Sequence, residues 1–172
     1  GHVEALGALK DLGCSMAEKN NFGWTAAFIA AQQWHVEALR ALKELGCRMA
    51  EKESAGGTAA HYAAQQGHVE ALRVLKDLGC PTAEKDNDGR TAAHYAAQEG
   101  HVEALRALKD LGCPMAEKDN DGRTAAHNAA QKGHVEVLRV LKDLVWPMGG
   151  EDSTGGTAAF IAALEGHGEG GA

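Results

Sequence analysis

Histidines and cysteines recur along the chain at an interval of 33 residues. Both residue types bind metal ions, and cysteines can also pair as disulfides. Three histidines follow a Thr-Ala-Ala triplet, namely His61, His94 and His127. Four cysteines keep the same interval, namely Cys14, Cys47, Cys80 and Cys113. A zinc site needs about four nitrogen or sulfur ligands at roughly 2.0–2.3 Å, and a disulfide needs two Cα atoms within about 7 Å. The fold therefore decides whether either chemistry is available.

The interval belongs to an internal repeat. The triplet Thr-Ala-Ala begins five times, 33 residues apart, at Thr25, Thr58, Thr91, Thr124 and Thr157. Residues 53–85 and 86–118 share 26 of 33 positions, which excludes chance and indicates recent duplication or consensus design. Periods of this length are typical of repeat proteins in which each unit is covered by its neighbours.

One unit, residues 86–118, predicts two short helices joined by turns. It opens with DNDGR, a composition that favours a tight turn. Thr91 can then cap a first helix, TAAHYAAQE, which Gly100 can end. A second helix starts at His101, ends at Gly112, and carries an apolar stripe of Val102, Leu105, Leu108 and Leu111. Helices this short are marginal alone in water, so adjacent units must bury the stripe.

Stacking of this kind separates equivalent positions by roughly 10 Å, the spacing of packed helices. Neighbouring histidines are then too far apart to share one zinc ion, and neighbouring cysteines are too far apart to form a disulfide. We therefore expect no metal site and no cofactor. Unpaired cysteines predict a cytoplasmic or other reducing intracellular location.

The stretch GRTAAHYAAQEGHVEALRALKDLGC, residues 89–113, resembles the ankyrin repeat, whose pattern is G-x-T-P-L-H-x-A-A-x-x-G-H-x-E and then a leucine-rich helix. The resemblance covers essentially the whole chain, although Ala92 and Ala93 replace the family's Pro-Leu. It implies an all-α solenoid of stacked helix-turn-helix units with short hairpin-like turns. It also implies that the histidine after each triplet hydrogen-bonds to the threonine and to turn backbone.

This framework predicts a single domain over residues 1–172 that starts and stops inside repeats. Its parts are a half repeat at 1–19, full repeats at 20–52, 53–85, 86–118 and 119–151, and a partial repeat at 152–172. Gly1 in place of methionine indicates a fragment or a processed end. The first part lacks a first helix, and the last has only a first helix, over residues 157–164. Chains could therefore associate head to tail. The alternative is that the boundaries cut through repeats, or that end repeats fray.

Several function classes are excluded by composition and pattern. A net charge of −7 argues against nucleic-acid binding, which needs a concentrated basic face. No apolar run reaches the roughly 18 residues that span a membrane. No phosphate-binding glycine loop precedes a helix, and no Ser/His/Asp set lies outside the repeated positions. We therefore expect no catalytic residues and no enzyme activity.

The resemblance instead implies a protein partner on the concave face, formed by turn tips and first helices. The predicted contact residues are Phe22, Trp24, Gln33, Arg90, Arg123 and Lys132. Phe22 and Trp24 are aromatic residues on a turn tip, where exposure favours an interface anchor. Arg90 and Arg123 are suited to carboxylates on the partner.

Two alternatives remain open. Phe22 and Trp24, together with Phe28 and Trp34, could simply cover the N-terminal end of the stack. The chain could also be a structural spacer or an engineered scaffold without a dedicated ligand, because the tips at 86–90 and 119–123 are identical. Trp34 replaces the glycine of the first turn and predicts a local rearrangement there.

Overall fold

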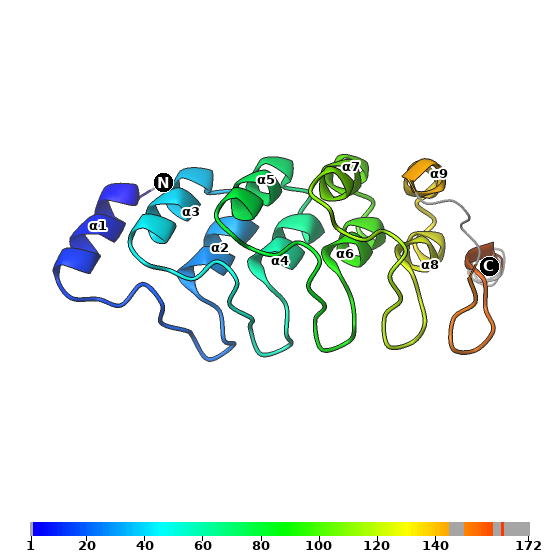
Figure 1. The fold of residues 1–172 in the computed structure, drawn as a ribbon, viewed down its shortest axis with the longest axis horizontal. Coiled ribbons are helices and arrows are strands. Elements are labelled where there is room, and N and C mark those ends of the chain that lie inside the picture. Colours follow the sequence, from blue (N-terminus) through cyan, green and yellow to red (C-terminus); the bar gives the residue numbers. More distant parts are fainter. Residues whose placement is uncertain (1, 145–149, 160–162, 164–172) are drawn as a thin grey trace, which may run out of the picture.

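The computed structural model describes residues 2–144, 150–159 and 163. These residues form nine α-helices and contain no β-strand. The helix expected over residues 157–164 falls largely outside the described residues. Figure 1 shows an elongated array in which helices alternate between two rows and loops project to one side. The expected all-α solenoid is confirmed.

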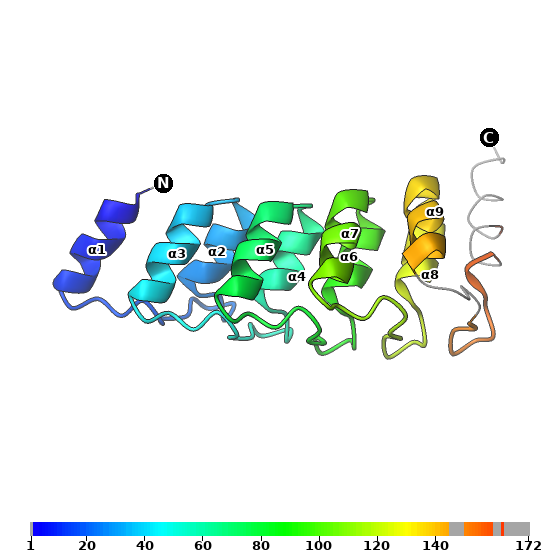
Figure 2. The same cartoon turned by 45° about the horizontal axis from the view of Figure 1, so that its top comes forward.

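The first row contains the seven-residue helices α2 (Ala26–Gln32), α4 (Ala59–Gln65), α6 (Ala92–Gln98) and α8 (Ala125–Gln131). The second row contains α1 (Val3–Asp11), α3 (Val36–Glu44), α5 (Val69–Asp77), α7 (Val102–Asp110) and α9 (Val135–Leu144). Each first-row helix contacts the second-row helix that follows it, and within each row every helix contacts its neighbour along the array. Figure 2 shows the same order from α1 to α9 along the long axis.

Small side chains let the first-row helices pack closely. In α6, Ala92, Ala93, Ala96 and Ala97 are all buried, and the same positions are buried in α4. The helix begins after Thr91, whose backbone is extended at ψ 170°. Gly67 follows α4 with a φ of 71°, a left-handed conformation that ends the helix and that glycine adopts without steric cost.

The second-row helices bury the predicted leucine stripe. Leu105 and Leu108 of α7 are fully buried, while Val102 and Leu111 are half-buried at its edges. The buried residues form one continuous cluster along the array, because every stripe is covered by adjacent repeats. This burial, at roughly 25 cal/mol per Å² of apolar surface, is the main stabilising term.

Loop tips are joined in register from one repeat to the next. The Asn87 amide N donates to the Ala55 carbonyl at 2.9 Å, and the Asn120 amide N donates to the Asp88 carbonyl at 2.9 Å. The Asn120 side-chain amide also donates to the Asn87 carbonyl at 2.9 Å. These bonds hold the tip residues in a fixed row.

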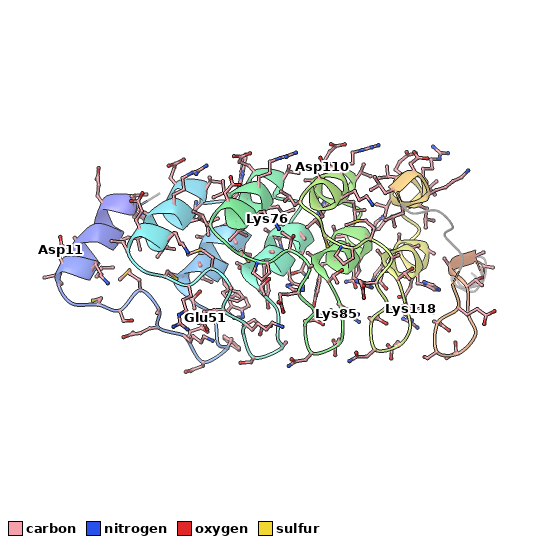
Figure 3. All side chains as sticks on the ribbon, in the orientation of Figure 1. Asp11, Glu51, Lys76, Lys85, Asp110 and Lys118 are labelled. Carbon is pink, nitrogen blue, oxygen red and sulfur yellow. The ribbon has the colours of Figure 1, made fainter. Side chains whose placement is uncertain are left out.

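Lysines join the bases of the same loops. Lys85 Nζ lies 2.8 Å from the Glu117 carboxylate and donates to the Lys118 carbonyl at 2.8 Å. Lys118 in turn donates to the Glu151 carbonyl at 2.7 Å. Figure 3 shows Lys85 and Lys118 side by side on consecutive loops. Consecutive loops are therefore joined both at their tips and at their bases.

Candidate functional site: the tip face

The tip face comprises the loop tips and the exposed side chains of α2, α4, α6 and α8, and it carries a row of aromatic rings. Phe22 is 68% exposed, and its ring centroid lies 6.1 Å from that of Trp24. Trp24 is half-buried because its ring meets Tyr62 of the next repeat edge-on, at 5.2 Å. The structure thus brings Phe22 and Trp24 together on one tip.

The row continues into the third and fourth repeats. Phe28 is buried and lies 5.6 Å from Tyr62, and His61 lies 5.7 Å from Tyr95. Trp24 and Phe28 therefore pack against the repeat that follows them rather than over the N-terminal end. The sequence analysis did not select Tyr62 or Tyr95. Their only signal was a tyrosine directly after the triplet histidine, at the exposed edge of a short helix.

Trp34 does not rearrange the turn, and that prediction is wrong. Its φ is 57°, the same left-handed conformation as Gly67 at the equivalent position. The turn keeps the same hydrogen bonds, because His35 N donates to Ala30 O at 2.8 Å as His68 N donates to Ala63 O at 2.9 Å. The indole is 62% exposed and stacks on the His68 ring at 6.0 Å. A bulky residue in this conformation is strained.

Arg90 and Arg123 lie at equivalent positions of consecutive repeats, and each is already near a carboxylate. Arg90 Nε is 4.0 Å from Asp119 Oδ2, and Arg123 Nε is 3.9 Å from Asp152 Oδ2. Both side chains are about one-third exposed, at 33% and 36%. Each arginine therefore spans to the following repeat, and part of its charge is balanced within the chain.

The structure does not bring the other two predicted contacts together. Gln33 and Lys132 are the exposed residues that directly follow α2 and α8, and they lie three repeats apart. They remain predicted contacts.

The tips from the third repeat onward are organised by an acidic side chain at their first position, and Asn20 takes this role at the tip of the second repeat. Asp86 Oδ1 accepts hydrogen bonds from the amide nitrogens of Asp88 at 3.0 Å and Arg90 at 2.8 Å. Its other oxygen accepts from the Tyr95 hydroxyl at 2.6 Å. Burial, together with this carboxylate, raises the pKa of Tyr95, so the phenol stays neutral. Burial, and then the charge of Glu53, also raise the pKa of Tyr62.

A pocket of about 210 Å³ opens between the third and fourth repeats. Its walls include Glu53, Gly57, Tyr62, Gln65 and Tyr95. Aromatic faces and a carboxylate thus meet in one small cavity on the tip face. The pocket was not predicted, because its walls come from two repeats.

The triplet histidines tie each repeat to the next. His61 Nε2 lies 3.1 Å from the Arg90 carbonyl, and His94 and His127 repeat this bond to Arg123 and Gly156 at 3.1 and 3.2 Å. A carbonyl only accepts, so Nε2 carries the proton and Nδ1 is an acceptor. Burial lowers the pKa of His61 and of His94 and keeps both neutral.

The second set of histidines, expected only to start helices, links each repeat to the one before it. His68 Nε2 lies 3.0 Å from the Gln32 carbonyl, and His101 and His134 repeat this bond to Gln65 and Gln98 at 3.0 and 2.9 Å. Histidine spacing alone did not indicate these contacts. Together the two sets use imidazoles as structural bridges rather than as ligands.

All four cysteines are free thiols. Cys14 is exposed, whereas Cys47, Cys80 and Cys113 are buried. Burial raises the pKa of all three buried thiols, that of Cys113 to about 11. Among residues 2–144, 150–159 and 163, no three His, Cys, Asp or Glu side chains are grouped as metal ligands.

Comparison with known proteins identifies the repeat. A family model of three consecutive ankyrin repeats matches residues 1–82, 43–119, 77–149 and 111–170. No curated protein matches the chain. None of the helices in the described part of the chain has the length and apolar character needed to cross a bilayer.

Proposed function

This chain belongs to the ankyrin repeat family, and we propose that it binds a protein partner along the tip face without catalysing a reaction. Ankyrin repeats generally mediate protein–protein binding. Here the partner would lie across the tips of the second to fifth repeats. Phe22 and Trp24 would anchor one end of the contact, and Arg90 and Arg123 would face its other end.

The observation that carries this proposal is the aromatic row from Phe22 to Tyr95. Phe22 is 68% exposed on a loop tip. Exposure of this apolar ring to water is unfavourable unless a partner covers it. Its neighbour Trp24 is held by Tyr62, so the anchor is preorganised and loses little side-chain entropy on binding. The hydrogen bonds between tips add to this rigidity.

Selection of displayed peptides on the 172-residue chain tests the proposal. Peptides recovered on the wild type should bind at least about tenfold more weakly to a Phe22→Ser/Trp24→Ser variant, since an aromatic residue that acts as a binding hot spot contributes about 2 kcal/mol or more. Trp34→Ser is the matched control, because Trp34 is a comparably exposed aromatic on the opposite turn. Equal loss in both variants, or no loss in either, would contradict binding at the tip face.

A second candidate is head-to-tail association, which also suits a spacer array. A largely apolar groove of about 390 Å³ lies between α1 and α2, and its walls include Leu6, Leu9 and Ile29. Residues 157–163 read TAAFIAA, the sequence of residues 25–31 that includes most of α2. Residues 157–163 of one chain could therefore occupy the groove between α1 and α2 of another chain. Light scattering should show a mass that rises with concentration, and Ile29→Asp should abolish the rise. A constant monomer mass up to millimolar concentration would exclude this candidate.

A further inference from the structure

Arginine occupies this tip position in the fourth and fifth repeats but not in the second and third. Two carboxylates, those of Glu53 and Asp86, therefore lack the neighbouring arginine that their equivalents have. Arg90 lies beside Asp119 and Arg123 lies beside Asp152, in each case 29 residues later. In the same register, Gly57 precedes Asp86 and Trp24 precedes Glu53. Neither Glu53 nor Asp86 has an ion pair with an arginine or lysine in the described structure.

Gly57 is not required by its backbone, because its φ lies outside the left-handed region. A Cβ at this position would lie 3.0 Å from Glu53 Oε1 and 3.5 Å from Tyr62 Cε2. The absent side chain is therefore what leaves the 210 Å³ pocket open. The next two repeats have an arginine at the equivalent position.

The Glu53 carboxylate is held in place but keeps acceptor capacity. Oε2 accepts from the Ala55 amide N at 2.8 Å, and Oε1 accepts from the Gly57 amide N at 2.9 Å. Each carboxylate oxygen can accept a second bond. Asp86 differs, because its Oδ2 already accepts a hydrogen bond from the Tyr95 hydroxyl at 2.6 Å. It therefore contributes negative charge but has less capacity to accept further hydrogen bonds.

The remaining walls suit a planar cation. The rings of Tyr62 and Tyr95 line the pocket from consecutive repeats, and aromatic faces attract a guanidinium through their quadrupole. The nearest cation in the row, Arg90, is not among the wall residues, and its Nε lies 4.0 Å from Asp119. The pocket therefore combines negative charge, aromatic faces and room for one long side chain.

We propose that this pocket accepts an arginine side chain of the partner, whose guanidinium donates to Glu53 and stacks on the tyrosine rings. Asp86 is not a wall residue, but it adds negative charge next to Tyr95. The inference rests on the proposed function, since it names the chemistry of the partner at the same face. Arginine suits the site better than lysine, because its planar head can stack on tyrosine while it donates to a carboxylate.

Titration with small probes tests the pocket directly. N-acetyl-arginine amide should shift the NMR signals of the Gly57 amide and the Trp24 indole. Its affinity should exceed that of the citrulline analogue by about tenfold, because a charged hydrogen bond is lost in the neutral isostere. The lysine analogue should bind more weakly than the arginine probe. Equal binding of the citrulline or lysine analogue would overturn the assignment.

Two variants locate the binding. Glu53→Asp/Gly57→Arg recreates the DxxxR pattern of residues 86–90 and should fill the pocket, so the arginine probe no longer shifts the Trp24 indole. Glu53→Gln keeps the size of the side chain but removes the charge and one of the two bonds from the Ala55 and Gly57 amides, so it should weaken the arginine probe about tenfold relative to the citrulline probe. Undiminished arginine binding in either variant, with the fold retained by circular dichroism, would overturn the inference.

The peptide selection separates this inference from the proposed function. Peptides that need Phe22 and Trp24 should contain an arginine and should lose affinity on Glu53→Asp/Gly57→Arg. Peptides that need the aromatics but carry no arginine would overturn the arginine pocket and leave the proposed function standing. Peptides whose affinity is unchanged in both sets of variants would overturn both the proposed function and the arginine pocket.

Discussion

His94 Nε2 lies 3.1 Å from the carbonyl oxygen of Arg123, while His94 Nδ1 lies 3.1 Å from the amide nitrogen of Thr91. One buried imidazole therefore caps its own helix and holds the tip of the next repeat. The carbonyl belongs to the residue that presents a guanidinium on the tip face. Repeat packing and tip geometry are coupled through this ring, and the same arrangement recurs at His61.

Acid should destabilise the stack through these histidines. Burial lowers the pKa of His61 and His94 below the ordinary 6.5, so the unfolded chain takes up protons first as the pH falls. Their contribution to the free energy of unfolding is then complete above about pH 6.5 and declines below it, toward the lower folded-state pKa. Urea unfolding of the wild type should show this decline between pH 7 and 5. A His61→Gln/His94→Gln variant should be less stable at pH 7 and should show a shallower decline. An equally steep decline in the variant would show that other titratable groups cause the loss of stability.

Truncation in the leucine stripe should be costly. Leu105→Ala should lower the free energy of unfolding by about 2–5 kcal/mol, because Leu105 is fully buried and its removal leaves a cavity. Leu12→Ala is the control, since Leu12 is 81% exposed, and it should change stability by less than about 0.5 kcal/mol. Denaturant titration measures both. Similar losses at the two sites would contradict burial of the stripe between repeats.

Replacing Trp34 by glycine should stabilise the protein. The left-handed backbone at Trp34 costs about 1–3 kcal/mol for a residue with a side chain, and the lost stacking on His68 offsets part of the gain. We expect a net gain of about 1 kcal/mol in chemical denaturation. Gly67→Ala is the opposite change in the next repeat and should destabilise, because its Cβ would lie 2.7 Å from the His101 ring. A loss of stability in Trp34→Gly would show that the stacked indole outweighs the strain.

Thiol labelling should distinguish the first cysteine from the other three. Cys14 is exposed, whereas Cys47, Cys80 and Cys113 are at most 2% exposed. Burial also raises their pKa values and so depletes the reactive thiolate. Mass spectrometry after brief alkylation at pH 7.5 should find one label per native chain, at Cys14, and four after denaturation. Rapid labelling of Cys80 in the native chain would indicate local opening of the stack.

Most of the fold could be predicted from the sequence, because its signals are local and repeated. The period, the turn residues and the leucine spacing predicted two helices in residues 86–118, and the structure has them as α6 and α7. The bounds differ by one or two residues. His101 was expected inside the second helix but lies before it, with ψ at 83°. Its ring instead reaches the Gln65 carbonyl of the preceding repeat, a contact that local pattern does not encode.

The candidate site was less predictable, because its parts come together across repeats. Phe22 and Trp24 were selected for their residue type, but Tyr62 became part of the row only through stacking. Arg90 was expected to be free for a partner, and its approach to Asp119 depends on the register between repeats. The error at Trp34 has a different origin. Tryptophan is disfavoured in the left-handed conformation that glycine adopts at this turn, yet the backbone hydrogen bonds of the turn hold Trp34 there.

The bonds that cross between repeats join residues 29, 32, 33 or 36 positions apart and so reach only the adjoining unit. Within the described part of the chain no such bond reaches beyond the adjoining unit, so tension applied at its two ends would load each junction in series. The weakest junction would yield first and release one unit, about 115 Å of extended polypeptide for 33 residues. The molecule would therefore lengthen in successive steps of nearly equal size.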